Sequence, residues 1–276
     1  MSIEPDITAA IDSGRLGPRL WLYSNYHCNL TCGYCLTESS PTSEPRELDA
    51  SAMRQLVDEA ADMGFRGIGI TGGEPFLRDD LAALAGEFSK TLPVLVLTNA
   101  TRFSGPNISR LDPIVDRDVT LQISLDWADP DPNDAMRAPH NFARVTDAIP
   151  RLLERGIGVR VATTVYGQSD AEIDRVSELV ASLGVAEEDH VIRPTIHRGR
   201  AIEAEMGELA TISDLPAEAT VTVDGLFWSP FAPTITAGRL DTDLLVSRQT
   251  LPLESGMSAF LGLVSGTPVP ESNRFR

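Results

Sequence analysis

The sequence predicts an α/β protein built on a partial (β/α)6 barrel and followed by a short C-terminal extension. Strand-like and helical patterns alternate between residues 20 and 196, and glycine-containing polar segments follow the strands. The chain has 276 residues, 42% of them hydrophobic, which is enough for one large core. We therefore expect an N-terminal segment at 1–19, a barrel at 20–202 and an extension at 203–276.

A separate sequence pattern predicts each strand and helix. Apolar, β-branched runs predict six strands, at residues 20–25, 65–70, 93–99, 119–126, 158–165 and 190–196. Capped amphipathic patterns predict helices at 49–64, 79–90, 141–155 and 169–183, with a looser helical region at 105–116. Strands separated by helices pair in parallel, so their carboxyl ends are expected to form one site. In the extension we expect a hairpin at 219–228 and a short helix near 256–264.

The composition argues against some classes of binding partner. The formal net charge is -17, from 40 acidic and 23 basic residues, which disfavours a nucleic-acid partner. No apolar run approaches the roughly 20 residues that a spanning helix needs. The N-terminus lacks the basic start and apolar stretch of a secretory signal. We expect no membrane partner and a cytoplasmic location.

The three cysteines of the chain are Cys28, Cys32 and Cys35, within eight residues of one another. An odd number of thiols at this spacing is typical of a metal site and not of disulfides. They suit a [4Fe-4S] cluster whose fourth iron has no cysteine in this sequence and stays open to a chelating ligand. Zinc held by the thiolates and a histidine such as His27 is the alternative, and it would make the chain a non-catalytic zinc- or cluster-binding module.

Two motifs resemble those of one family. The segment CNLTCGYC, residues 28–35, resembles the C-x-x-x-C-x-aromatic-C motif of the radical S-adenosylmethionine (SAM) superfamily, and Gly72-Gly73-Glu74-Pro75 resembles its GGEP motif. The resemblance implies an oxygen-sensitive enzyme with the partial barrel of that family and one [4Fe-4S] cluster on Cys28, Cys32 and Cys35. It would cleave SAM reductively to a 5′-deoxyadenosyl radical, with electrons from a donor such as flavodoxin or ferredoxin.

The resemblance also implies residues that bind the cofactor SAM. Tyr34 would lie near the adenine, Ser124 and Asp126 would bind the ribose, and the GGEP segment would face the ammonium group. Arg137 is expected at the carboxylate, while Asn99, Thr164 and Arg193 end their strands in the same region. The full set of cofactor-binding candidates is Tyr34, Gly72, Gly73, Glu74, Pro75, Asn99, Ser124, Asp126, Arg137 and Thr164. No catalytic residue is predicted.

The sixth strand leads to His197, Arg198 and Arg200. These residues form either a basic pocket for a carboxylate or phosphate, or solvated loop charges. Trp127 stands where the family has glycine, and it either stacks on adenosine or substrate or packs as an ordinary core residue.

The extension resembles a family module without its metal. Residues 221–233 resemble the start of a SPASM-type extension, in which cysteines bind auxiliary clusters. Here Ser229 stands at the first cysteine position and no cysteine follows, so we expect one cluster and an extension that caps the barrel mouth. An ordinary hairpin is the alternative.

The predicted function is radical chemistry on a small metabolite, in biosynthesis. The roughly 20 residues before the first strand are too few for a leader-recognition domain, which favours a metabolite or a peptide delivered by another protein. Modification of a ribosomally made peptide is the alternative.

Overall fold

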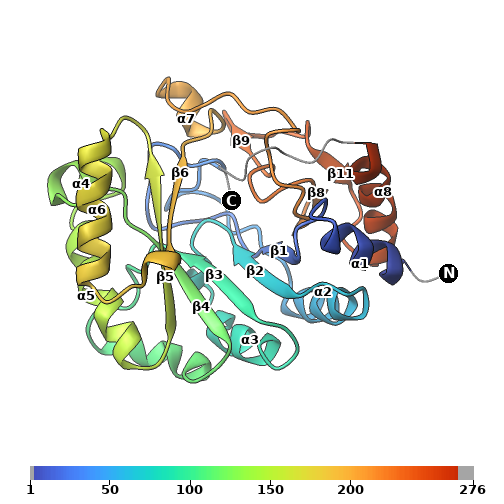
Figure 1. Cartoon of the computed structure of the whole chain (residues 1–276), viewed down its shortest axis with the longest axis horizontal. Helices are drawn as coiled ribbons and strands as arrows, with labels where there is room; N and C mark the ends of the chain where they lie inside the picture. The colour runs from blue at the N-terminus through green and yellow to red at the C-terminus, as the bar shows by residue number, and fades with distance from the viewer. Residues whose placement is uncertain (1–2, 267–276) are drawn as a thin grey trace.

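The computed structural model describes residues 3–266 and contains six parallel strands in chain order (Figure 1). Neighbouring strands pair in parallel throughout the barrel. The prediction of a partial (β/α)6 barrel is confirmed. The strands are β1 (Arg19–Tyr23), β2 (Gly67–Thr71), β3 (Val94–Thr98), β4 (Val119–Ser124), β5 (Gly158–Val165) and β6 (His190–Pro194).

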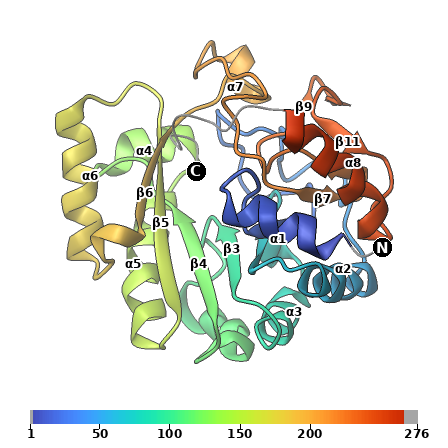
Figure 2. The same ribbon diagram turned by 45° about the vertical axis from the view of Figure 1, so that its right-hand side comes forward.

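Helices cover the outer face of the curved sheet (Figures 1 and 2). The α-helices are α2 (Ala50–Asp62), α3 (Leu81–Phe88), α4 (Pro130–Met136), α5 (Asn141–Glu154) and α6 (Asp170–Ser182). Shorter 3-10 segments are η1 (Pro75–Leu77), η2 (Gly105–Ile114) and η3 (Glu187–Asp189). The looser region at 105–116 is thus a 3-10 helix, and α4 was not predicted. Proline starts α4, where its missing N–H costs no helical bond.

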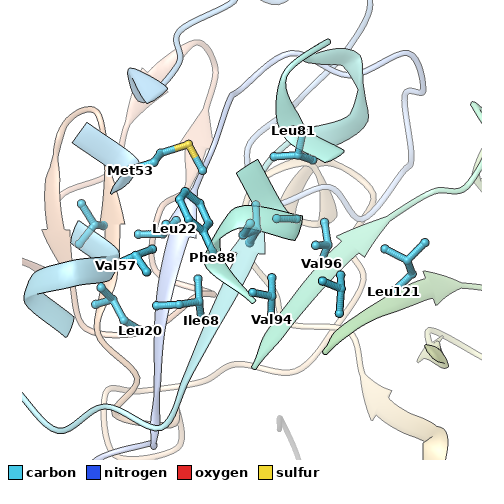
Figure 3. Packing of buried hydrophobic residues seen from close by; sticks show 14 of the residues in the cluster. Leu20, Leu22, Met53, Val57, Ile68, Leu81, Phe88, Val94, Val96 and Leu121 are labelled. Atoms are coloured by element: carbon cyan, nitrogen blue, oxygen red, sulfur yellow. The ribbon is translucent and has the colours of Figure 1, made fainter. Parts of the chain in front are cut away.

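The main apolar core lies between the sheet and these helices (Figure 3). Leu20 and Leu22 of β1 and Ile68 of β2 pack towards Met53 and Val57 of α2. Alternate residues of a strand point to opposite faces, so the neighbours of the core residues point to the inner face of the barrel. Among them, the side chains of Trp21, Gln122 and Arg160 line the barrel lumen.

The extension continues the barrel sheet. β7 (Thr220–Thr222) pairs in parallel with β1, and the sheet order is β11-β8-β7-β1-β2-β3-β4-β5-β6. The predicted hairpin is confirmed as β7 and β8 (Gly225–Phe227) around Asp224. The remaining elements are β9 (Ile235–Thr236), β10 (Arg239–Leu240), β11 (Leu245–Ser247), α7 (Arg200–Glu203) and α8 (Leu253–Gly266). The proposed division at residues 19 and 202 stays a prediction.

The N-terminal segment also joins this side of the molecule. α1 (Glu4–Asp12) lies against α8, and α8 also contacts α2 (Figure 2). Within residues 3–266 no helix has the length and apolar character needed to cross a bilayer.

Candidate functional site

The predicted site residues meet at the carboxyl ends of the parallel strands. The cysteine loop follows β1, Gly72 follows β2 and Asn99 follows β3. Ser124 ends β4, and Thr164 is the penultimate residue of β5. The structure therefore brings these segments, far apart in sequence, to one edge of the barrel.

The three thiols lie in surroundings that suit a metal cluster. Cys28 is buried, whereas Cys32 and Cys35 are partly exposed. Burial, Glu74 and the other two cysteines raise the pKa of Cys28 to about 12, although a hydrogen bond from the Leu30 N–H opposes the shift. Burial also raises the pKa of Cys32, against the effect of Arg137. Such thiols lose their protons when they bind iron, because the metal charge replaces the missing counter-charge.

The same geometry bears on the zinc alternative. Across residues 3–266 no three cysteine, histidine or acidic side chains surround a point where one metal ion would bind. The His27 ring lies 3.7 Å from Glu47 and 3.5 Å from the Asn25 amide. Zinc needs four ligands at about 2.0–2.3 Å, whereas a cluster spreads its cysteines over separate irons.

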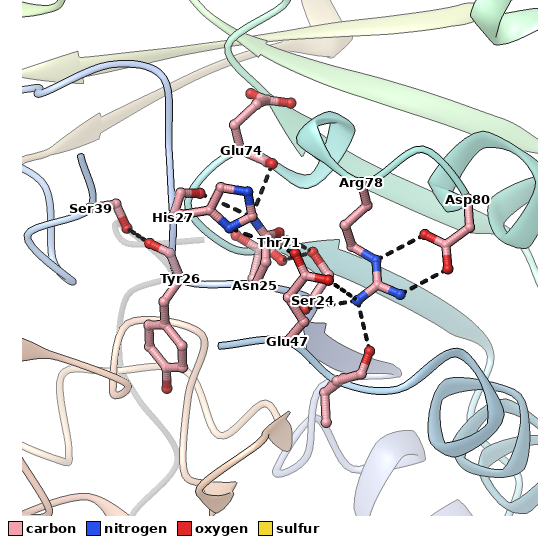
Figure 4. Close-up of polar contacts among 11 residues, drawn as sticks. Ser24, Asn25, Tyr26, His27, Ser39, Glu47, Thr71, Glu74, Arg78 and Asp80 are labelled. Atoms are coloured by element: carbon pink, nitrogen blue, oxygen red, sulfur yellow. Dashed lines mark hydrogen bonds and ion pairs between the residues drawn. The ribbon is translucent and has the colours of Figure 1, made fainter. Parts of the chain in front are cut away.

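The two glycines of the GGEP segment allow its backbone to approach Asn25 and His27, which Figure 4 shows together with Glu74. The Gly73 N–H donates to the Asn25 carbonyl at 2.8 Å, and the Glu74 N–H donates to the His27 carbonyl at 3.0 Å. A Cβ on Gly73 would lie 2.1 Å from the His27 oxygen, and one on Gly72 would lie 2.6 Å from the Asn25 oxygen. Glycine at both positions thus joins the end of β2 to the start of the cysteine loop.

The Glu74 carboxylate is fully buried and bound by protein donors. Oε1 accepts from the Phe76 N–H at 3.0 Å and the Thr98 hydroxyl at 2.8 Å, and Oε2 accepts from the Asn99 N–H at 2.7 Å. Burial raises the pKa of Glu74 even though all three donors lower it. The adjacent Pro75 is buried and begins η1. The side chain of Glu74 therefore positions β3 against the GGEP turn.

Asn99 connects this turn to the cysteines. Its side-chain amide lies 3.7 Å from the Cys28 sulfur and donates to Asn29 Oδ1 at 3.0 Å. Thr101 donates to the Asn99 oxygen through both its N–H and its hydroxyl. Asn29 and Thr101 were not predicted, because a polar residue in a loop gives no sequence signal for the atom it faces.

Tyr34, Asp126 and Arg137 form one buried hydrogen-bonded group. Asp126 Oδ2 accepts from the Tyr34 hydroxyl at 2.6 Å and from Arg137 Nη1 at 3.1 Å, and Arg137 also donates to the Tyr34 oxygen. Asp126 Oδ1 accepts from the Thr164 N–H at 3.0 Å. Burial alone lowers the pKa of Arg137, but Tyr34, Cys32 and Asp126 together raise it well above its ordinary value. Arg137 Nε has no hydrogen-bond partner among the described residues.

Other residues of the site were missed or left open. Arg200 donates to the carbonyls of Cys32 and Ser39 at 2.5 and 3.1 Å, so it holds the cysteine loop. Thr37 lies 3.7 Å from the Cys35 sulfur. Trp127 donates to the Tyr166 hydroxyl at 2.5 Å, which places it in an aromatic contact and not in the core.

A cavity of about 420 Å³ opens beside these residues into the barrel lumen. Tyr34 and Cys35 lie at its site end, and Arg160 and Arg193 line its wall. Glu218 of the extension also lines it and accepts from the Trp21 indole at 2.6 Å. The lumen therefore offers room for a ligand next to the cysteines.

Known proteins share both the sequence and the fold. Residues 22–180 match the model of the radical SAM superfamily. Mycofactocin maturase MftC of Mycobacterium tuberculosis is 31% identical over 183 residues, which cover 66% of this chain and 46% of that protein. The chain thus spans about half the length of this relative, and the family match does not reach the extension.

Two solved structures have the same fold. SuiB of Streptococcus suis bound to precursor peptide SuiA has a TM-score of 0.62 at 14% identity, covering 98% of this chain and 78% of SuiB. Native anSMEcpe with bound AdoMet has a TM-score of 0.65 at 12% identity, covering 94% and 81%. The family match over more than half of the chain and the shared fold lead to one conclusion. The chain belongs to the radical SAM superfamily, a family of enzymes that use a [4Fe-4S] cluster and S-adenosylmethionine.

Proposed function

We propose that this enzyme binds one [4Fe-4S] cluster through Cys28, Cys32 and Cys35 and acts on an organic substrate in the barrel cavity. The observation that carries the proposal is the position of the three thiols at the strand ends, with Cys35 lining that cavity. When bound, the cluster and SAM supply reductive cleavage to a 5′-deoxyadenosyl radical. The 276 residues contain no further cysteine for a second cluster.

The residues around the thiols would orient both cofactors. Asn99 donates towards the Cys28 sulfur, and Arg137 places a positive charge close to Cys32. Tyr34 and Asp126 present a rigid polar surface at the ends of β4 and β5. Fixed donors and charges of this kind need no reorganisation when the substrate reacts. The ribose, adenine and carboxylate roles of Ser124, Asp126, Tyr34 and Arg137 remain part of the proposal.

A small metabolite is the substrate class that the cavity supports best. Its volume of about 420 Å³ is typical of small-molecule sites and it lies inside the barrel. A radical that abstracts hydrogen requires close, aligned contact, which a pocket inside the barrel provides. We expect an electron donor such as flavodoxin or ferredoxin to reduce the enzyme.

A peptide substrate is the second candidate, and the named relatives favour it. MftC is a maturase, and SuiB was solved with a precursor peptide. A single side chain or chain end of a peptide would fill the same cavity. Supplying candidate precursor peptides and small metabolites in parallel, and searching each for a mass change, separates these two substrate classes.

Anaerobic reconstitution tests the proposal. We expect about four irons and four sulfides per chain, and 5′-deoxyadenosine or an adenosylated product after reduction with SAM. Replacing Cys32 by alanine should abolish both iron binding and cleavage. Thr42→Ala, an exposed change in the same loop, should leave both intact. One zinc ion per chain without SAM cleavage would refute the proposal.

A further inference from the structure

Arg193 faces the cavity without a polar partner. It lies on β6 opposite Thr164 of β5, and its guanidinium lies over the Phe231 ring at 5.3 Å. Within residues 3–266 its guanidinium makes no hydrogen bond or ion pair. Burial lowers the pKa of Arg193, and the nearby Arg160 lowers it further. Tyr34 and Asp126 act in the opposite direction and raise it. A buried guanidinium that no carboxylate contacts directly gains from binding an anion.

The other charged groups of the cavity have counter-charges. Arg19 is close to Glu218, which attracts it, and Arg160 Nε lies 3.7 Å from Asp189. These pairs leave Arg193 as the positive charge of the lining without its own carboxylate. The cavity is thus locally basic in a chain of net charge -17.

The polar groups that act on Arg193 are already bound by other residues. Asp126 accepts hydrogen bonds from Arg137 and from the Tyr34 hydroxyl. The basic pocket that was one of two alternatives for His197, Arg198 and Arg200 does not form, because Arg198 pairs with Asp243 at 2.7 Å and Arg200 donates to two carbonyls. Among the residues that the structure describes, the cation that is free to bind a ligand lies inside the barrel and not on the loop after β6.

We propose that the substrate carries a carboxylate, and that Arg193 binds this group inside the cavity. One unpaired positive charge matches one negative charge, and the planar guanidinium binds the two oxygens of a carboxylate together. The inference rests on the proposed function and names the substrate class for the same site.

The position of Arg193 places such a substrate close to the reacting groups. Thr164, its neighbour across the sheet, binds Asp126 through its N–H, and Tyr34 and Cys35 line the same cavity. A carboxylate on Arg193 would therefore fix one end of the substrate near the cysteines. Either a small acid or the carboxylate of a peptide satisfies this chemistry, and the parallel substrate search described above distinguishes them.

Fluorine NMR on the reconstituted enzyme with SAM, without reductant, tests the inference. The probes are 4-fluorophenylacetate, its neutral amide and 4-fluorophenyl phosphate. The acid should bind in the millimolar range and at least about tenfold more tightly than the amide. Arg193→Gln should lose that preference, whereas Arg144→Gln, an exposed change of equal charge, should retain it.

Three results would overturn the inference: no binding of the acid up to about 20 mM, an unchanged preference in Arg193→Gln, or a stronger preference for the phosphate. Thermal unfolding adds a second readout. Because Arg193 makes no hydrogen bond or ion pair within residues 3–266, the glutamine variant should lose only the contact with Phe231 and unfold within about 4 °C of the wild type, and a larger fall in Tm would also contradict the inference. SAM cleavage is measured separately, so a wild type that cleaves SAM but ignores the acid refutes this inference alone.

Discussion

The Glu74 carboxylate shows how one buried charge organises the site. Three donors from two neighbouring segments converge on it, and its backbone joins the cysteine loop. Its raised pKa means that the folded state holds the Glu74 proton more tightly than the unfolded state does. The associated stability is therefore fully present below the unfolded pKa and is lost as pH rises through the folded pKa. The hydrogen bonds from Thr98 and the backbone limit that loss.

Thr98→Val removes one of those donors. The variant should lose about 2 kcal/mol in free energy of unfolding at neutral pH, because the bond goes to a charged acceptor. The pKa of Glu74 should rise further, so the loss should be smaller at about pH 5.5 than at about pH 8. Urea unfolding at both pH values measures this. Thr195→Val, which removes a hydroxyl bonded to the Val165 carbonyl, is the control and should cost the same at both. Equal pH dependence in the two variants would refute the assignment.

Arg200 offers a second test at the level of one side chain. Its two bonds to the carbonyls of Cys32 and Ser39 fix the cysteine loop, and its charge lies close enough to Cys32 to lower that thiol's pKa. Arg200→Met should speed iron loss to a chelator by about tenfold and shift the cluster's reduction potential. Arg198→Met, which removes contacts to Asp243 and Asp241, should change neither quantity.

The sequence predicts some of the candidate site residues and misses others. Cysteine spacing and the GGEP segment are local patterns, and the structure places both at one edge of the barrel. Arg200 and Thr37 were not assigned to the cysteine loop because their contacts depend on which way a side chain turns after the chain has folded. Arg193 was expected only as a strand-end candidate, and its lack of a partner is a property of the whole lumen.

At the level of elements, the connection from β6 to α7 packs directly against the cysteine loop. Gly199 has φ +58° and ψ -135°, and a Cβ there would lie 2.3 Å from the Leu36 oxygen and 2.5 Å from the Cys35 oxygen. The neighbouring Arg200 N–H donates to the Cys35 carbonyl at 2.9 Å. The connection after β6 therefore holds the cysteine loop, which is the connection after β1, in place.

Gly199→Ala should cost more stability than its positive φ alone explains, because the added Cβ would also clash with the backbone of the cysteine loop. We expect a loss of about 3 kcal/mol in stability and reduced iron content after reconstitution. Gly105→Ala is the matched control, because Gly105 has φ +57° and open space around it. It should cost about 1 kcal/mol and retain iron, as measured by unfolding and by metal analysis. Equal iron loss in both variants would contradict a specific role for the contact.

Whole elements were predictable where one pattern decided them. Strands β1 to β4 are mostly buried apolar runs, β5 and β6 are rich in β-branched residues, and the long helices have one apolar face, so local sequence was sufficient. The 3-10 segment η2 contains Pro113, which interrupts an α-helical pattern, and α4 has few apolar residues. Their conformation depends on packing against neighbouring elements.

For the whole molecule, the continuous sheet is the feature that local sequence could not give. β7 pairs with β1 although about 200 residues separate them, and Glu218 from the extension binds Trp21 of β1. A hairpin pattern predicts the turn but not the strand that it joins. The extension therefore shares both the sheet and the core of the barrel.

A shared core predicts that barrel and extension unfold together. Trp228 is almost fully buried and stacks on Phe260 at 4.9 Å, within the same cluster as Leu20 and Leu22 of β1. Trp228→Ala should lower the free energy of unfolding by about 3–5 kcal/mol, and Leu209→Ala, at an 82% exposed site, by less than about 0.5 kcal/mol. The variant retains Trp21 and Trp127, so its fluorescence follows the barrel and the contact of Trp21 with Glu218 of the extension, while circular dichroism follows the whole chain. Coincident urea transitions by both probes are expected, since loss of packing in the extension removes support from β1. A separate, earlier circular-dichroism transition with unchanged fluorescence would show instead that the extension is an independent unit.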